Sequence, residues 1–119
     1  MPSSSVRLCR LEQLPDGASR GFDPFGAGYD TLFIVRRGAQ LHAWRDACPH
    51  LHGVGMAWRK DAYLNASGDR IVCSAHGAMF DVVTGRCLLG PCEGQFLQPV
   101  AVSVSEAGEV MIATPGVHE

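Results

Sequence analysis

The segment RIVCSAHGAMFD, residues 70–81, is the most informative part of the chain, because it sets two potential metal ligands in a short loop beside a strand. Residues 70–74 and 79–83 are short β-branched and apolar runs of the kind that form strands. Between these runs, Cys73 and His76 stand three apart, and Gly77 follows directly. The segment therefore predicts a loop at a strand end that presents one thiol and one imidazole.

A second cysteine-histidine pair stands earlier in the chain, in DACPHLHG (46–53), where Cys48 precedes His50 by two positions. Two such loops can close on one metal centre and supply two thiolates and two imidazoles. Zinc could take all four ligands in a tetrahedron. A two-iron cluster could instead take both thiolates on one iron and both imidazoles on the other. Because the cysteine comes first in each pair, the two loops are equivalent, and this regularity favours iron.

The two motifs also resemble a known family. CPH followed by CSAHG is similar to the Rieske-type [2Fe–2S] signature, and MFDVVTGRCLLGP (79–91) continues the likeness to Phe-Asp, Thr-Gly and Gly-Pro positions of that family. The resemblance covers roughly residues 30–113. Stand-alone members of this size are the ferredoxin components of bacterial ring-hydroxylating dioxygenase systems. The 22-residue gap between the ligand loops is longer than is typical of the family, and the excess is expected in residues 58–70.

By this resemblance, Cys48 and Cys73 hold the buried iron of one [2Fe–2S] cluster, and His50 and His76 hold the iron nearer the surface. Gly77 would let the second loop pass close to the cluster. Gly90 and Pro91 would form a third loop that shields the cluster from water.

The resemblance also bears on the reduction potential. High-potential members of the family carry an extra disulfide between the ligand loops, and Gly53 and Ala75 occupy those positions here. They also carry a serine and a tyrosine whose hydroxyls donate to the cluster, whereas this chain has Ala78 and Phe80. The resemblance therefore implies a potential toward the lower end of the Rieske range, near ~−150 mV.

Strand signals dominate the rest of the chain. Runs at 6–14, 30–37 with 41–47, and 96–114 predict further strands and hairpins, punctuated by 14 glycines and 7 prolines. We expect one all-β domain over 1–119, a Rieske-like fold of small antiparallel sheets with a cluster-binding subdomain made from the two ligand loops. Two long segments, 15–28 and 48–69, are predicted to be irregular.

Composition narrows the function. A net charge of −2 and a pI near 6.2 show no excess of positive charge of the kind that binds nucleic acid. The chain shows no signal peptide and no apolar run that could span a membrane, so a cytoplasmic protein is expected. Five cysteines suit metal binding in a reducing compartment better than a disulfide framework.

The expected function is one-electron transfer from a reductase to a terminal oxygenase. No catalytic constellation is visible, so the chain is expected to be a carrier and not an enzyme, with no small-molecule substrate. Two alternatives remain open: the Rieske-like small subunit of a nitrite reductase-type enzyme, or a zinc-stabilised binding module. An apolar rim for a transient partner interface is expected from Leu51, Val54, Met56 and Pro91.

Several other residues could be taken for functional ones. His52 is expected to be an exposed loop residue, and His42 to face solvent from a strand. Cys87 and Cys92 bracket a short turn and could be read as a disulfide or redox pair, but a strand residue and a loop thiol are the favoured readings. Phe33 and Trp44 are the core candidates.

Overall fold

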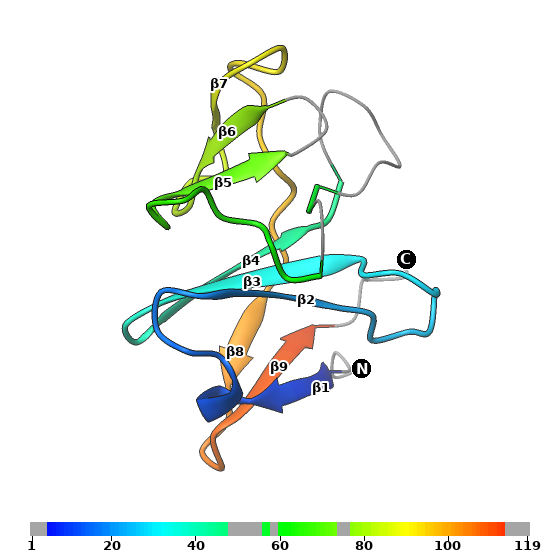
Figure 1. The fold of residues 1–119 in the computed structure, drawn as a ribbon. Coiled ribbons are helices and arrows are strands. Elements are labelled where there is room, and N and C mark those ends of the chain that lie inside the picture. Colours follow the sequence, from blue (N-terminus) through cyan, green and yellow to red (C-terminus); the bar gives the residue numbers. More distant parts are fainter. Residues whose placement is uncertain (1–4, 48–55, 58–59, 74–76, 114–119) are drawn as a thin grey trace.

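The computed structural model describes residues 5–47, 56–57, 60–73 and 77–113. Nine strands within these residues form three antiparallel sheets, which follow one another along the molecule (Figure 1). The lower sheet has the order β1 (Ser5–Arg10), β9 (Glu109–Ala113), β8 (Val102–Val104). The middle sheet consists of β2 (Ser19–Phe22), β3 (Leu32–Arg37) and β4 (Gln40–Arg45). The upper sheet consists of β5 (Arg70–Cys73), β6 (Ala78–Asp81) and β7 (Cys87–Leu89).

The middle sheet separates two hydrophobic cores. Successive side chains of a strand point to opposite faces, so Phe33 and Val35 of β3 join the upper core while Leu32 and Ile34 join the lower one. All four side chains are buried, which explains why β3 reads as an unbroken apolar run instead of an alternating one. Each such burial contributes on the order of 1.5–3 kcal/mol to folding.

The upper core lies between the middle and upper sheets and positions the predicted metal site. Its buried members come from both sheets and from the segments that connect them. They are Phe33, Val35, Trp44, Met56, Tyr63, Ile71, Cys73, Ala78, Phe80, Val82, Cys87, Cys92 and Leu97. Phe33 and Trp44 are thus confirmed as core residues.

Most of the predicted hairpins are confirmed. β3 and β4 pair from Leu32 opposite Arg45 to Arg37 opposite Gln40, and Gly38 takes the positive φ of 61° that the tight turn requires. β6 and β7 flank the Thr-Gly turn, and β8 and β9 form the last hairpin. The all-β class and the small antiparallel sheets are therefore as expected. The first strand is shorter than predicted, because a 3-10 helix (Leu11–Gln13) follows β1.

Residues 15–28 were expected to be irregular, and this expectation is wrong for the four residues Ser19–Phe22. They contain β2, which pairs with β3 along its whole length. Gly21 lies inside β2, and a Cβ atom there would come within 3.0 Å of side-chain atoms of Asp30 and Tyr63. The strand is hard to see in the sequence because its central glycine is selected for this close approach and not for β propensity.

The expected irregular segment 48–69 also contains ordered pairing at its end. Leu64 forms a bridge with Ile71, and the Val72 amide donates to the Tyr63 carbonyl at 2.8 Å. The Asn65 side chain accepts from the Asp69 amide at 3.0 Å and closes the tip. No helix in the described part of the chain has the length and apolar character needed to cross a membrane.

Candidate metal centre

Of the four predicted ligands, Cys73 lies within the described residues, and Cys48, His50 and His76 lie outside them. Cys73 is the last residue of β5, and its side chain is completely buried in the upper core. The Gly77 amide donates to the Cys73 carbonyl at 2.8 Å, and Gly77 adopts a φ of 70°. The chain between β5 and β6 therefore leaves and re-enters the sheet at adjacent points, as a ligand loop at a hairpin end requires.

Asp46 ties together the two ends of the segment that carries Cys48. One carboxylate oxygen of Asp46 accepts from the Met56 amide at 2.8 Å, and the other accepts from the Tyr63 hydroxyl at 2.7 Å. The Asp46 amide donates to the Thr31 carbonyl at 2.9 Å. Residues 46 and 56, on either side of the first predicted ligand loop, are thus held at one place.

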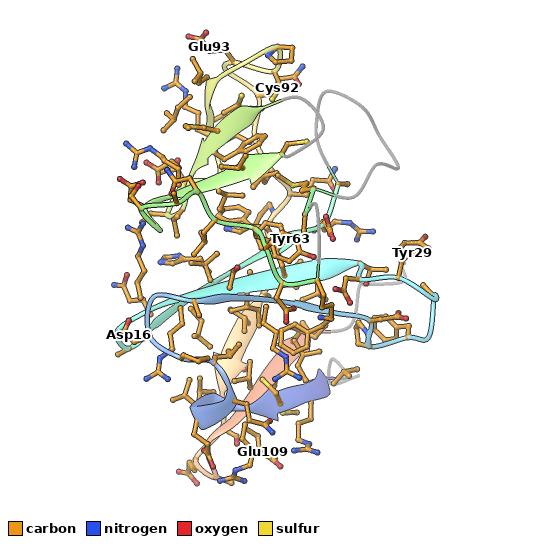
Figure 2. All side chains as sticks on the ribbon, in the orientation of Figure 1. Asp16, Tyr29, Tyr63, Cys92, Glu93 and Glu109 are labelled. Carbon is orange, nitrogen blue, oxygen red and sulfur yellow. The ribbon has the colours of Figure 1, made fainter. Side chains whose placement is uncertain are left out.

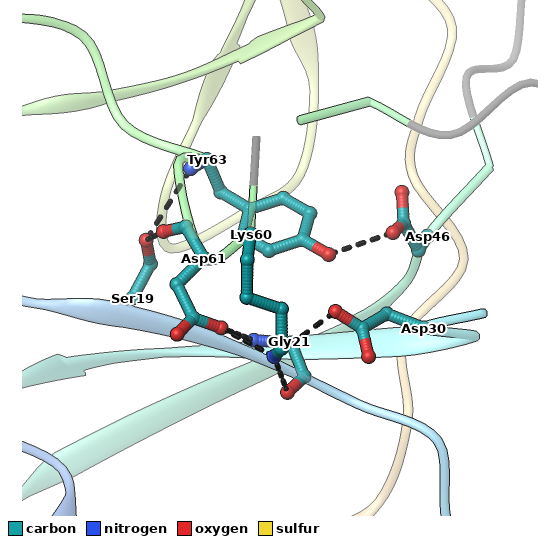
Figure 3. Close-up of polar contacts among 7 residues, drawn as sticks. All are labelled: Ser19, Gly21, Asp30, Asp46, Lys60, Asp61 and Tyr63. Carbon is teal, nitrogen blue, oxygen red and sulfur yellow. Dashed lines mark hydrogen bonds and ion pairs between the residues drawn. The ribbon is translucent and has the colours of Figure 1, made fainter. Parts of the chain in front are cut away.

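Tyr63 connects this anchor to the middle sheet. Its ring stacks on Phe33 with centroids 4.1 Å apart and an interplanar angle of 9°, and only 1% of the residue is exposed. Burial, followed by the hydrogen bond to the Asp46 carboxylate, raises the pKa of Tyr63 far above its usual range. Tyr63 therefore remains a neutral hydrogen-bond donor. Figure 2 shows the Tyr63 side chain between the upper and middle sheets, and Figure 3 shows its hydroxyl directed at Asp46.

The chain segment before Tyr63 is fastened to β2 by a polar cluster (Figure 3). The Lys60 ammonium donates to the Gly21 carbonyl at 2.8 Å and lies 2.7 Å from Asp61 and 3.1 Å from Asp30. The Gly21 amide donates to the same Asp61 carboxylate at 2.8 Å, and the Ser19 hydroxyl donates to the Asp61 carbonyl at 2.7 Å.

The charges in this cluster support one another. Burial lowers the pKa of Lys60, but the hydrogen bonds to Asp61 and Asp30 outweigh burial, so the pKa is raised overall. Burial raises the pKa of Asp61, and here the bonds from Lys60 and the Gly21 amide outweigh it, so the pKa is lowered. Both groups stay charged at neutral pH, and the long connection between the ligand loops is docked on the middle sheet.

The predicted third loop lies against the start of β6, where the chain leaves the second ligand loop. Gly90 has a φ of 112°, and a Cβ atom there would lie 2.9 Å from the Cα atom of Ala78, the residue that follows Gly77. Leu89 and Pro91 on either side are exposed. Only glycine allows the two backbones this approach, which places the 88–91 segment against the start of β6.

Two predictions about individual side chains are wrong. Met56 was expected at an exposed apolar rim, but it is completely buried in the upper core. His42 was expected to face solvent, but its Nε2 atom is buried and has no hydrogen-bond partner among the described residues. Burial and then the charge of Arg37 lower the pKa of His42, and Asp81 opposes them. Three further residues of these predictions lie outside the described residues: Leu51 and Val54 of the apolar rim, and His52, which was expected to be an exposed loop residue.

A groove of about 330 Å³ lies on the other side of the middle sheet. Leu32, Pro99 and Ile112 are among its mostly apolar lining residues. Leu32 and Ile112 belong to the lower core and Cys73 to the upper one, so the groove and the Cys73 side chain lie on opposite faces of the middle sheet.

The chain matches the Rieske [2Fe-2S] domain family over residues 4–110. It belongs to this family. It is also 33% identical over 108 residues to the curated ferredoxin CarAc of Metapseudomonas resinovorans, with 91% of this chain and 92% of the relative covered. That relative is a ferredoxin of matching length.

Solved structures agree with this assignment. A structure of the complex of reduced oxygenase and oxidised ferredoxin in carbazole 1,9a-dioxygenase contains a chain that is 29% identical to this one. Its TM-score is 0.72, and the match covers 99% of this chain and all of that one. A putative NADH-dependent nitrite reductase small subunit from Mycobacterium tuberculosis has a TM-score of 0.69 over 98% of this chain and all of that one. Its identity is 15%, so it shows a shared fold and nothing further.

The Rieske domain carries one [2Fe–2S] cluster, and the described residues fit it. Cys73 is a fully buried thiol at a strand end, which suits the iron that is kept from solvent. The adjacent Gly77, with its positive φ and open surroundings, gives the backbone room at the loop. When bound, the cluster supplies one-electron redox chemistry. The chain's own residues supply the anchors: Asp46 and Tyr63 for the first loop and Gly77 and Gly90 around the second.

Sequence reasoning missed Asp46 and Tyr63. Asp46 stands two residues before Cys48, and nothing in its local pattern distinguishes it from a turn aspartate. Tyr63 stands 17 positions later, and the two meet only because the connection folds back on the middle sheet.

Proposed function

We propose that this protein is a one-electron carrier that accepts an electron from a reductase and passes it to a terminal oxygenase. The observation that carries the proposal is the identity of 33% to a ferredoxin over nearly the full length of both chains. The 29% identical ferredoxin from a structure of an oxygenase–ferredoxin complex supports an oxygenase as the acceptor. The chain carries electrons between its partners and acts in the cytoplasm. The oxygenase, and not this chain, oxidises the organic substrate.

We propose Cys48, His50, Cys73 and His76 as the cluster ligands. The complete burial of Cys73 and the tight return of the chain at Gly77 support the second pair. The clasp that Asp46 forms between residues 46 and 56 supports the first pair, because it closes a short loop around Cys48 and His50.

The ligand assignment is tested by comparing His50→Ala and His76→Ala with His52→Ala, each purified anaerobically. The first two variants are expected to lose the Rieske electron paramagnetic resonance signal, and the His52 variant is expected to keep it. Wild type should hold two iron and two acid-labile sulfide per chain, as a [2Fe–2S] cluster requires. Zinc without sulfide in fresh wild type would support the binding-module alternative, and loss of the signal in the His52 variant alone would reverse the assignment.

The partner is proposed to dock on the exposed apolar side chains near the third loop. Leu88 is 39% exposed, Leu89 and Phe96 are each 55% exposed, and Pro91 is exposed beside them. Small apolar surfaces of this kind suit the brief encounters of redox partners. Phe96 also pairs with Arg86 next to β7, so these side chains belong to one end of the molecule.

The docking proposal is tested with Leu89→Glu and the control Val104→Glu. Val104 is an exposed apolar residue, at 42%, but it lies on β8 in the lower sheet. Stopped-flow measurement should show slower electron transfer to and from Leu89→Glu with an unchanged cluster spectrum, and normal rates for Val104→Glu. Equal rates in the two variants would place the docking surface elsewhere.

We also propose that residues 1–119 form a single domain. The middle sheet contributes to both hydrophobic cores, so neither outer sheet can be removed without exposing buried apolar surface of β3. Limited proteolysis should release no stable fragment that corresponds to one sheet alone.

A further inference from the structure

Cys87 and Cys92 bring two buried sulfur atoms together outside the proposed ligand set. Their Sγ atoms lie 2.8 Å apart, and each residue is only 1% exposed. Cys87 is the first residue of β7, and Cys92 lies in the turn that follows it. Figure 2 shows Cys92 at the upper end of the molecule, close to the third loop.

The backbone holds these two residues in register without help from the thiols. The Cys87 amide donates to the Gln95 carbonyl at 2.7 Å, and the Gly94 amide donates to the Cys87 carbonyl at 3.1 Å. The Gln95 amide donates to the Cys92 carbonyl at 2.8 Å. The approach of the sulfurs is therefore built into the turn.

A disulfide needs an S–S distance of about 2.05 Å, so the two sulfurs must close by less than about 1 Å. No change of backbone register is needed for a movement of this size. The other described cysteine outside the ligand set, Cys9, lies in the lower core and cannot compete for either sulfur. The geometry thus fits an intramolecular disulfide between Cys87 and Cys92.

We propose that Cys87 and Cys92 form a reversible dithiol–disulfide site next to the cluster loops, oxidised by a small-molecule disulfide of the glutathione class. In the first step, one thiolate attacks the small disulfide, forms a mixed disulfide and releases one small thiol. In the second step, the other cysteine, as its thiolate, attacks the protein sulfur of that mixed disulfide and releases a second small thiol. Two protein thiols lose two electrons and two protons, and one small disulfide becomes two thiols.

A small disulfide can reach the two buried thiols because the residues around them are exposed. Residues 88, 89, 91 and 93–96 around the two cysteines are exposed, so local opening of this turn uncovers a thiol without unfolding the core. Hydrogen peroxide reaches the same product by another route, because a sulfenic acid on one sulfur condenses with the neighbouring thiol and the peroxide ends as water.

The bond would close a short ring around residues 88–91. This ring contains Gly90, whose backbone lies against Ala78 at the start of β6. Oxidation would therefore hold the third loop against the start of β6, directly after Gly77. The site itself does not depend on the proposed electron-transfer function, although the effect of the disulfide on the cluster does.

Trypsin separates the cysteines for the test. Cleavage after arginine leaves Cys87 and Cys92 together in the fragment 87–119, which contains no other cysteine. Cys9, Cys48 and Cys73 fall in three other fragments, 8–10, 46–59 and 71–86. A disulfide between Cys87 and Cys92 is thus an internal bond of one peptide, read directly from its mass.

Holoprotein is equilibrated in glutathione buffers of increasing oxidation, quenched, denatured with an alkylating reagent and digested. As the buffer becomes more oxidising, fragment 87–119 should lose two hydrogens and take up no alkyl group, while 8–10 remains alkylated. Reduction before alkylation should restore two alkyl groups, and visible absorbance reports whether the cluster survives. Fragment 87–119 that stays doubly alkylated in the most oxidising buffer, or that is linked to another fragment, would overturn the proposal.

Two variants sharpen the result. Cys92→Ala should leave Cys87 unable to form the internal bond, and the matched control Cys9→Ala should form it as wild type does. Loss of the internal bond in Cys9→Ala would contradict the assignment of the pair. The wild-type experiment stands alone if Cys92→Ala does not fold.

Discussion

Tyr63→Phe is expected to lower the free energy of unfolding by removing one hydrogen bond. The substitution removes the hydroxyl that donates to Asp46 at 2.7 Å and leaves the ring stacked on Phe33. The aromatic area buried in the upper core is retained, so packing changes little. The loss of stability therefore reports the Tyr63–Asp46 hydrogen bond alone, which joins the long connection to the start of the first ligand loop.

The magnitude follows from the nature of the acceptor. A hydrogen bond to a charged group contributes about 1.5–3 kcal/mol to stability. Tyr63 is 1% exposed, but Asp46 is only partly buried, so water can partly replace the lost donor. We therefore expect a loss at the lower end, about 1.5–2 kcal/mol. At roughly 4 °C per kcal/mol for a chain of this size, the melting temperature should fall by roughly 6–8 °C.

The assay is a thermal ramp under anaerobic conditions at one scan rate, followed by circular dichroism and by the visible absorbance of the cluster. The matched control is Tyr29→Phe, which removes the hydroxyl of the other tyrosine, a residue that is 69% exposed. Cluster bleaching in Tyr63→Phe should begin at a lower temperature, because the first ligand loop loses an anchor. A melting temperature as close to wild type as that of Tyr29→Phe would show that the Tyr63–Asp46 hydrogen bond does not stabilise the fold.

A double-mutant cycle assigns the effect to the pair. Asp46→Asn and Tyr63→Phe together should cost less than the sum of the two single changes, because both remove the same interaction. Additive losses would mean that the two side chains act separately.

Three further outcomes are expected. Gly85→Ala should cost about 2–4 kcal/mol, because it adds strain at a φ of 74° and a Cβ atom 2.6 Å from the Trp44 ring. Gly38→Ala, at a φ of 61° in open space, should cost about 1–2 kcal/mol. Equal losses of unfolding free energy in the two variants would show that the contact with the Trp44 ring adds nothing to the cost of Gly85→Ala. The pKa of His42 is lowered in the folded chain, so the unfolded chain binds the proton at a higher pH than the folded chain does. The stability of wild type should therefore fall as the pH drops below about 6.5. His42→Gln should flatten this pH dependence in denaturant titrations. Ala78→Ser should raise the reduction potential in film voltammetry from about −150 mV, since a hydroxyl that donates to the cluster stabilises its reduced form. A clearly positive potential in wild type would contradict the expected low potential.

Strands whose signals are local could be predicted from the amino-acid sequence. The β3–β4 hairpin and the β8–β9 hairpin could be predicted because alternation and turn residues lie within a few positions of each other. The family could also be predicted, because CPH and CSAHG are compact motifs whose chemistry constrains spacing within each loop. The match over residues 4–110 confirms that prediction.

Contacts between distant side chains became visible in the folded chain alone. Gly21, Asp46 and Tyr63 belong to three segments, and each looks ordinary in its own neighbourhood. β2 was missed because its central glycine serves contacts with Asp30 and Tyr63, and that requirement leaves no period-two pattern. Met56 was misplaced at the surface because an apolar residue in a loop reads as exposed until the loop is known to fold back onto the core.

The pairing of Cys87 with Cys92 shows the same division at shorter range. Their separation of five positions in the sequence is compatible with a bridge and equally with two unrelated thiols. The backbone bonds of Gln95 and Gly94 to the strand end turn both sulfurs inward and bring them to 2.8 Å. Local patterns report the conformational preference of neighbouring residues, whereas contacts between segments depend on how the sheets stack, which is a property of the whole chain.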